Sequence, residues 1–148
     1  MLINTVEALD EITPRLLACT DPCVDTETTG LSIYGNASRK RDEVIGISID
    51  VGPEAYYFPF RHAQGVNLPM ECMDFFRRYL PDPNRTFGGW NYNYDLHMMA
   101  FDGIKIAPNF EDAMLAMHLY NENEPDFKLK PTADRYHIGD GSLQESIL

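Results

Sequence analysis

The chain has 148 residues, of which 44% are hydrophobic and 24% are charged, as in a single folded domain with a buried core. No apolar run reaches the roughly 18 residues that a membrane-spanning helix needs, and the N-terminus lacks the basic and apolar regions of a signal peptide. The formal net charge of −11 argues against tight, free-standing binding to nucleic acid, because phosphate contacts depend on Lys and Arg.

The cysteines and histidines show no metal-binding pattern. Cys19, Cys23 and Cys72 are odd in number and lack Cys-x-x-Cys spacing, so free thiols in a reducing cytoplasm are expected rather than disulfides or zinc. The four histidines show no ligand spacing such as His-Glu-x-x-His. We expect one cytoplasmic domain over residues 1–148, with no membrane partner.

The first predicted elements are a helix and a strand. Apolar residues recur at helical intervals over 5–18, where Thr5 is a partial N-cap and Pro14 predicts a break or kink. The strand follows at 23–28, within the sequence Val24-Asp25-Thr26-Glu27-Thr28-Thr29-Gly30-Leu31.

Asp25 and Glu27 stand two residues apart on this strand. Alternate side chains of a strand share one face, so the two carboxylates should project side by side, with Thr26 on the opposite face. Adjacent carboxylates repel each other unless a cation lies between them, and Mg²⁺ or Mn²⁺ suits such an oxygen site. The alternative is two exposed acids beside a turn, since Asp-x-Glu is common by chance.

A loop, a hairpin and a helix are predicted next. Residues 31–42 form the loop, whose basic run Arg39-Lys40-Arg41 is either solvated or in contact with a phosphate backbone. β-branched and aromatic residues predict an antiparallel hairpin of strands 44–49 and 55–60 beside the first strand, and Pro59 places its end near a sheet edge. A helix and a short strand follow, over 68–80 and 85–89.

The second acidic constellation is Gly88-Gly89-Trp90-Asn91-Tyr92-Asn93-Tyr94-Asp95-Leu96-His97-Met98-Met99. Asn91 should lie at a strand-to-helix turn, and Asp95 in the first turn of the helix, where the helix dipole favours an anion. Helix stabilisation would explain Asp95 alone. Together with Asp25 and Glu27, however, it indicates a metal cage at the ends of adjacent elements.

The last third of the chain is predicted to hold short elements. These are a strand over 103–106, a helix over 112–120, an acidic loop over 121–126, a short helix over 128–136 interrupted or begun at Pro131, and a turn at 140–142. Residues 143–148 are too few to fold alone.

These segments resemble the DEDD 3′–5′ exonucleases. The stretch "VDTETTGL" is similar to their first motif, and "GWNYNYDLHMM" to their second, with an Asn four residues ahead of the Asp. The segments "EDAMLAMHLY" and "FKLKPTADRYHIG" are similar to those that follow in the proofreading domains of family A DNA polymerases, including phage ones. The resemblance, from about residue 23 to residue 139, implies an α/β, RNase H-like fold: a mixed five-stranded sheet, antiparallel across its first three strands and flanked by helices.

The resemblance also implies an activity, which is hydrolysis of DNA from the 3′ end during replication, with two Mg²⁺ or Mn²⁺ ions about 4 Å apart. Asp25 would bridge both ions, Glu27 would hold the one on the nucleophile's side, and Asp95 would hold the second, directly or through water. The implied substrate contacts come from Thr28, from Leu31 as a wedge under the terminal base, and from Asn91. The implied partners are a single-stranded DNA 3′ end and a DNA polymerase domain or subunit, which would supply the missing basic track.

The family's third motif, Tyr-x-x-x-Asp or His-x-x-x-x-Asp on a later helix, should follow these segments, but the sequence given stops at Leu148. The run Tyr136-His137-Ile138-Gly139-Asp140 fits the first spacing, but its Gly and the turn after it argue against a helix, so we interpret it as a chance match. With one ligand absent, the first metal site should bind Mg²⁺ weakly and tolerate Mn²⁺ better.

Three hypotheses stay open. The first is the exonuclease domain of a phage-type polymerase, or a fragment of it, whose last helix is missing or supplied by another chain. The second is a catalytically weak module with the same fold that binds nucleic acid or a polymerase. The third is an RNase H-like exonuclease directed at RNA.

Overall fold

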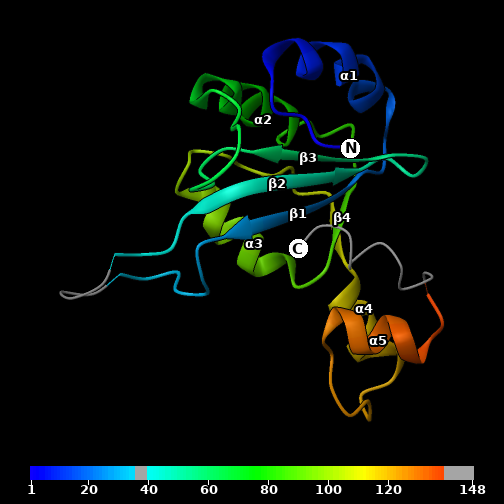
Figure 1. Cartoon of the computed structure of the whole chain (residues 1–148). Coiled ribbons are helices and arrows are strands. Elements are labelled where there is room, and N and C mark those ends of the chain that lie inside the picture. The colour runs from blue at the N-terminus through cyan, green and yellow to red at the C-terminus, as the bar shows by residue number, and fades with distance from the viewer. Residues whose placement is uncertain (36–39, 139–148) are drawn as a thin grey trace.

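The computed structural model, described for residues 1–35 and 40–138, contains a five-stranded sheet in the order β3-β2-β1-β4-β5 (Figure 1). The antiparallel part consists of β1 (Cys23–Thr28), β2 (Val44–Asp50) and β3 (Ala55–Pro59). The strands β4 (Phe87–Gly89) and β5 (Phe110–Asp112) continue the sheet in parallel with β1. The predicted mixed sheet, antiparallel across its first three strands, is confirmed.

The helices are α1 (Val6–Ala18), the 3-10 turn η1 (Met70–Cys72), α2 (Met73–Tyr79), α3 (Tyr92–Ala100), α4 (Ala113–Tyr120) and α5 (Leu129–Arg135). As predicted, Thr5 caps α1, accepting a hydrogen bond from the amide of Ala8 at 3.2 Å. Of the break or kink predicted at Pro14, the break is wrong: α1 continues through Pro14, and buried residues on both sides of it pack into one core, which outweighs one lost backbone hydrogen bond. No helix in the described part of the chain is long and apolar enough to cross a membrane.

Two other predicted elements differ from the structure. The helix expected from residue 68 becomes regular only at Met73, after the 3-10 turn. The strand expected at 103–106 is absent, and β5 is the fifth strand instead. The amides of Ile104 and Ala107 donate to the carbonyls of Met99 and Leu80, at the ends of α3 and α2, so this segment closes helix termini and has no strand partner.

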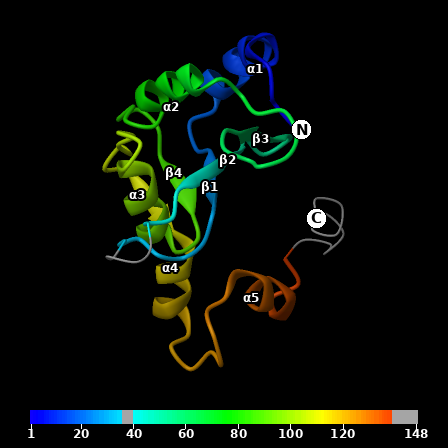
Figure 2. The ribbon, with the colours of Figure 1, turned by 60° about the vertical axis from the view of Figure 1, so that its left-hand side comes forward.

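One face of the sheet carries the core. The inward side chains of β1, β2 and β3 join α1, α2 and α3 in one cluster, which includes Val24, Ile47, Ile49, Tyr56, Phe58, Leu16, Phe76 and Met98. Figure 2 shows α2 and α3 on the same side of the strands. By strand alternation and register, the opposite face presents Cys23, Asp25, Glu27, Ser48, Asp50 and Tyr57, and we call it the acidic face.

The edge strand β3 is covered by the first residues of the chain. The amide of Ile3 donates to the carbonyl of Tyr57 at 2.8 Å, and the amide of Tyr57 donates to the carbonyl of Met1 at 2.9 Å. Pro59, which lacks an amide hydrogen, ends this edge strand as predicted. The N-terminal residues thereby blunt an edge that would otherwise offer unpaired backbone groups.

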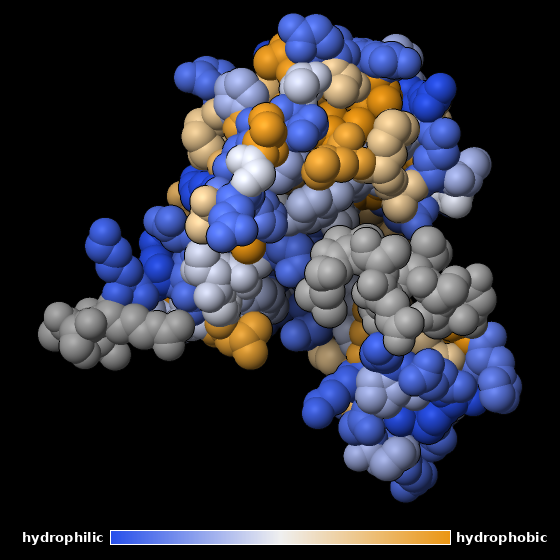
Figure 3. Space-filling model, viewed as in Figure 1, coloured by the Kyte–Doolittle hydropathy of each residue, from blue (hydrophilic) through white to orange (hydrophobic). Residues whose placement is uncertain are grey.

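Helices α4 and α5 form an arm, residues 113–138, that projects away from the sheet (Figures 1 and 2). The ring of His118 stacks on Phe127 with centroids 3.4 Å apart, and Arg135 forms an ion pair with Glu124 at 2.8 Å. The indole of Trp90 donates to the carbonyl of Phe127 at 3.1 Å and so joins the arm to the end of β4. On the side seen in Figure 3, the arm is largely hydrophilic.

Two neighbouring leucines of α1 test the position of the core. Leu16 is fully buried, whereas Leu17 is 51% exposed on the same helix. Leu16→Ala should lower the free energy of unfolding by about 2–5 kcal/mol, because it leaves a cavity in the core. Leu17→Ala, the matched control, should change it by no more than about 0.5 kcal/mol. Urea unfolding measures both, and equal effects would contradict this packing.

Candidate active site

The strand β1 places Asp25 and Glu27 on the acidic face and Thr26 on the core face, as alternation predicts. Both acids are exposed, and Thr26 is 8% exposed. Partial desolvation of the Asp25 carboxyl group raises its pKa, and the charge of Glu27 raises it further. The two carboxylates therefore lie close enough to repel each other.

Asp95 lies in the first turn of α3, as predicted, and is 3% exposed. The amide of Thr26 donates to Asp95 Oδ1 at 3.1 Å, and the Thr26 hydroxyl donates to the same oxygen. Burial raises the pKa of Asp95 to about 6, and the charge of Asp25 adds to the rise, although the hydrogen bonds from Thr26 oppose it. Asp95 is thus hydrogen-bonded to β1 from the core face. The charge of Asp25, which lies on the other face of the strand, still contributes to the raised pKa of Asp95.

The three predicted metal ligands are only partly brought together. Asp25 and Glu27 share one face, and Asp95 approaches the same strand from α3. Within residues 1–35 and 40–138, no three His, Cys, Asp or Glu side chains are arranged as a metal cluster. Two adjacent oxygen donors of like charge nevertheless suit a hard divalent cation, and Thr26 occupies only Oδ1 of Asp95. The metal site stays a prediction.

The two predicted substrate contacts after β1 differ in exposure. The hydroxyl of Thr28 donates to the carbonyl of Gly30 at 2.9 Å and lies 2.9 Å from the hydroxyl of Tyr94, which itself donates to Gly30 at 2.6 Å. Leu31 is 84% exposed. Thr28 therefore holds the loop in shape, while Leu31 presents an apolar surface to solvent.

The same loop is clamped by the buried carboxylate of Asp42. Its Oδ1 accepts from the hydroxyl of Thr29 at 2.9 Å, and its Oδ2 accepts from the amide of Ser32 at 2.7 Å. A side chain at Gly30 would place its Cβ 2.8 Å from Asp42 Oδ2, so the carboxylate can approach only because residue 30 is Gly. Asp42 fixes the backbone that carries Leu31.

Asn91 directly precedes α3, one helical turn before Asp95. It adopts a left-handed conformation with φ 56°, and its amide donates to Asp112 Oδ1 at 3.1 Å. Asp112 also accepts from the amide of Tyr92 at 2.9 Å and caps α4 through Met114, so it joins the starts of α3 and α4. Asn91 lines an open hollow of about 420 Å³ with Phe110, Leu96 and Met114. In the described chain its side chain forms no hydrogen bond with Asp25, Glu27 or Asp95.

The basic run of the loop is only partly described, because Arg39 lies outside the described residues. Lys40 is exposed. The guanidinium of Arg41 lies 4.1 Å from the ring centroid of Phe101, so Arg41 packs on the end of α3. Contact of this run with a phosphate backbone stays a prediction.

Sequence reasoning missed three supporting residues. Thr26 bonds to Asp95, Tyr94 bonds to Thr28, and Asp42 bonds to Thr29. Two signals were available, since Thr26 stands between the two acids and Tyr94 directly precedes Asp95. Asp42 offered no signal beyond its place before a strand.

Comparison with known proteins assigns this chain to a protein family. A family model described as 3′–5′ exonuclease matches residues 1–137. The chain is 25% identical over 147 residues to DNA polymerase I of Borreliella burgdorferi, covering 99% of the chain and 15% of that protein. It is 33% identical over 110 residues to a DNA-directed DNA polymerase of Pseudomonas phage M6, covering 69% of the chain and 16% of the phage protein.

A solved structure shares the fold. Escherichia coli RNase D, described as an exoribonuclease involved in structured RNA processing, superposes with a TM-score of 0.68 at 15% identity. The match covers 100% of this chain and 36% of RNase D. The chain therefore spans about one sixth of the length of its polymerase relatives and about a third of this structural one.

The raised pKa of Asp95 predicts a pH-dependent stability. The carboxyl group of Asp95 has a pKa of about 6 in the folded chain and near 3.9 in the unfolded chain, so the folded chain binds the proton more tightly. The free energy of unfolding therefore falls as the pH rises from about 4 to about 6, and the loss is complete above pH 6. In metal-free buffer, Asp95→Asn should raise the free energy of unfolding at pH 7 by up to about 3 kcal/mol, and the gain should vanish as the pH falls towards 4. Urea unfolding between pH 4 and 8 measures this. A pH-independent difference, or a less stable variant at pH 7, would contradict it, and Asp134→Asn on exposed α5 is the control.

The clamp formed by Asp42 predicts a local effect. Asp42→Ala leaves the amide of Ser32 and the hydroxyl of Thr29 without this acceptor, and should lower the free energy of unfolding by about 1–3 kcal/mol. Amide hydrogen exchange at Ser32 should accelerate, whereas exchange at Ile47 in the sheet should follow global stability. Unchanged protection of Ser32 would show that Asp42 does not hold the loop.

Proposed function

Because this chain belongs to the family of 3′–5′ exonuclease domains of the DNA polymerase I type, we propose that it removes nucleotides from the 3′ end of single-stranded DNA by metal-dependent hydrolysis. The observation that carries this proposal is the pair Asp25 and Glu27, side by side on one face of β1, with Asp95 tied to the same strand. All three acids lie within the residues that match the family.

The proposed roles follow from the contacts. Mg²⁺ or Mn²⁺ bound at Asp25 and Glu27 would lower the pKa of an attacking water and polarise the scissile phosphate. Asp95, held in place by Thr26, would complete the cation's environment from the side of α3. The exposed Leu31 offers its apolar side chain to the terminal base, on a loop that Thr28 and Asp42 keep in shape.

DNA is proposed as the substrate because both curated relatives are DNA polymerases. The likeness to RNase D, at 15% identity, concerns the fold and does not transfer a substrate. The net charge of −11 supports a domain that meets a strand delivered by another part of a polymerase, which would supply the basic contacts. Proofreading during replication is the corresponding proposed role.

A second candidate is a catalytically weak module that binds nucleic acid or a polymerase. It is favoured by the lack of a three-residue metal cluster among the described residues. The hydroxyl of Tyr136 donates to Glu124 at 2.7 Å within the arm, which supports a structural role for this Tyr. Asp140, the partner in the Tyr-x-x-x-Asp spacing, lies outside the described residues.

The test is release of mononucleotides from a 3′-labelled single-stranded DNA oligonucleotide with Mg²⁺ or Mn²⁺. Asp25→Asn and Glu27→Gln should each lower the rate at least about 100-fold, because each removes an anionic oxygen ligand of the cation that would stabilise the charge of the transition state. Asp50→Asn is the matched control, since Asp50 is an exposed acid of the same face at the far end of β2 and should leave the rate unchanged.

The outcomes separate the hypotheses. Release from DNA that is lost in the Asp25 and Glu27 variants supports the exonuclease. Equal loss in Asp50→Asn would mean that general charge, rather than this pair, is responsible. A matched RNA oligonucleotide that is degraded faster would replace DNA as the substrate, and a folded protein that binds DNA without cleaving it would favour the binding module.

A further inference from the structure

Tyr57 shares the acidic face with the two acids of β1. In the sheet register, Asp25 is opposite Ser48, and Ser48 is opposite Tyr57. The next row along the sheet runs from Glu27 through Gly46 to Pro59. Gly46 thus lies between Glu27 on one side and the strand of Tyr57 on the other.

The aromatic ring of Tyr57 crosses this row over Gly46. A Cβ atom at Gly46 would come within 2.7 Å of Cε2 of Tyr57 and still closer to its Cζ and hydroxyl. Any larger residue would therefore displace the ring. The absence of a side chain at Gly46 leaves room for the Tyr57 hydroxyl over this residue, whose cross-strand neighbour is Glu27.

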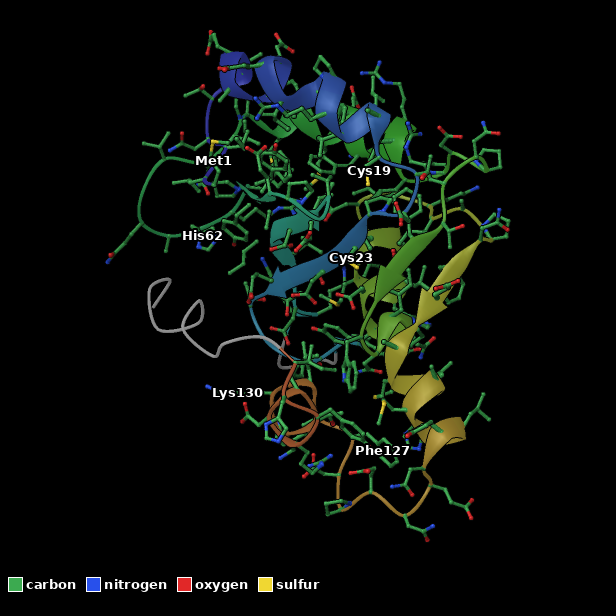
Figure 4. The ribbon with its side chains drawn as sticks, turned by 90° about the vertical axis from the view of Figure 1, so that its right-hand side faces the viewer. Met1, Cys19, Cys23, His62, Phe127 and Lys130 are labelled. Carbon is green, nitrogen blue, oxygen red and sulfur yellow. The ribbon has the colours of Figure 1, made fainter. Side chains whose placement is uncertain are left out.

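The hydroxyl of Tyr57 is held by His62. It lies 2.5 Å from Nε2 of His62, and the two rings meet edge to face with centroids 5.7 Å apart. The backbone of His62 is fixed in turn by Asn67, whose side chain accepts from the amide and donates to the carbonyl of His62, both at 2.9 Å. Figure 4 shows His62 on the side of the sheet where β1 ends.

The electrostatics connect this pair to Glu27. Desolvation is the main cause that raises the pKa of Tyr57 to about 12, and the charge of Glu27 is the second. The phenol therefore keeps its proton at neutral pH. When Nε2 of His62 is protonated, it donates a hydrogen bond to the phenol oxygen of Tyr57. The phenol hydrogen is then not used in that bond and can point towards Glu27.

We propose that Tyr57, oriented by His62, is a positioning residue that holds the carboxylate of Glu27 ready for a divalent cation. The inference rests on the proposed function. The ring seated on Gly46 would restrict the side-chain conformations open to Glu27, and the hydroxyl could donate a hydrogen bond to its carboxylate. Such partners of metal-binding residues raise metal affinity without contacting the metal.

The test compares two adjacent tyrosines of β3 by calorimetric titration of the whole chain with Mn²⁺. Tyr57→Phe keeps the ring and removes the hydroxyl, and should weaken Mn²⁺ binding about 10-fold. Tyr56→Phe is the matched control, because the Tyr56 hydroxyl on the core face bonds to Glu54 and should not affect Mn²⁺. His62→Ala should weaken binding in the same direction as Tyr57→Phe.

A second readout needs no metal. In the metal-free protein, the carboxyl carbon resonance of Glu27 should shift in Tyr57→Phe and stay unchanged in Tyr56→Phe. A merely structural role for Tyr57 would leave this resonance in place while lowering stability. Gly46→Ala, which keeps the hydroxyl but displaces it together with the ring, should also shift the resonance if the variant folds, and Tyr57→Phe decides the question if it does not.

The outcomes distinguish this inference from the proposed function. Mn²⁺ binding that is lost in Asp25→Asn but unaffected in Tyr57→Phe overturns the role of Tyr57 alone. No Mn²⁺ binding by the unmodified chain, or binding that Asp25→Asn leaves intact, overturns the proposed metal site and this inference with it. Weakening in Tyr57→Phe and His62→Ala, with Tyr56→Phe unchanged, supports both.

Discussion

The hydrogen bonds from Thr26 to Asp95 are the contact on which the rest of the candidate site depends. They join the central strand to α3 through a buried carboxylate, at the point where the strand turns its two acids to the other face. Because side chains alternate along a strand, a slip of one residue would bury Asp25 or Glu27 and expose Thr26. The desolvation of Asp95 costs stability, but its two donors on β1 favour one register over its neighbours.

Next to this contact, hydrogen bonds within the loop after β1 determine which of its polar side chains are already engaged. Thr28 and Asp42 are occupied in holding the turn after β1, and this leaves Leu31 exposed on a fixed backbone. Single exposed apolar side chains are common on protein surfaces, so the exposure of Leu31 permits the proposed contact with a terminal base but does not by itself indicate one.

Local patterns predicted the sheet and the acids well, because β1 to β3 carry their own signals. The bounds of β1, the pairing of Asp25 with Glu27 and the place of Asp95 in its helix all follow from spacing within a few residues. The failures involve partners distant in sequence. The amides of Ile104 and Ala107 bond to helix ends, which no local pattern at 103–106 indicates, and Thr26 meets Asp95 only because α3 packs on the sheet. The ring of Tyr57 lies over Gly46 only because residue 46 has no side chain, which no local pattern at Tyr57 indicates.

The ion pairs of the chain show how the charges of Asp25 and Glu27 are balanced. Arg61 pairs with Asp102, Arg85 with Asp82 and Arg135 with Glu124, and none of these pairs includes an acid of the acidic face. Within the described residues, no ion pair includes Asp25 or Glu27, so their mutual repulsion is uncompensated by the protein. Two like charges that are kept adjacent in this way are typical of a site whose balancing charge comes from outside the chain, which is the part that the proposed cation would take.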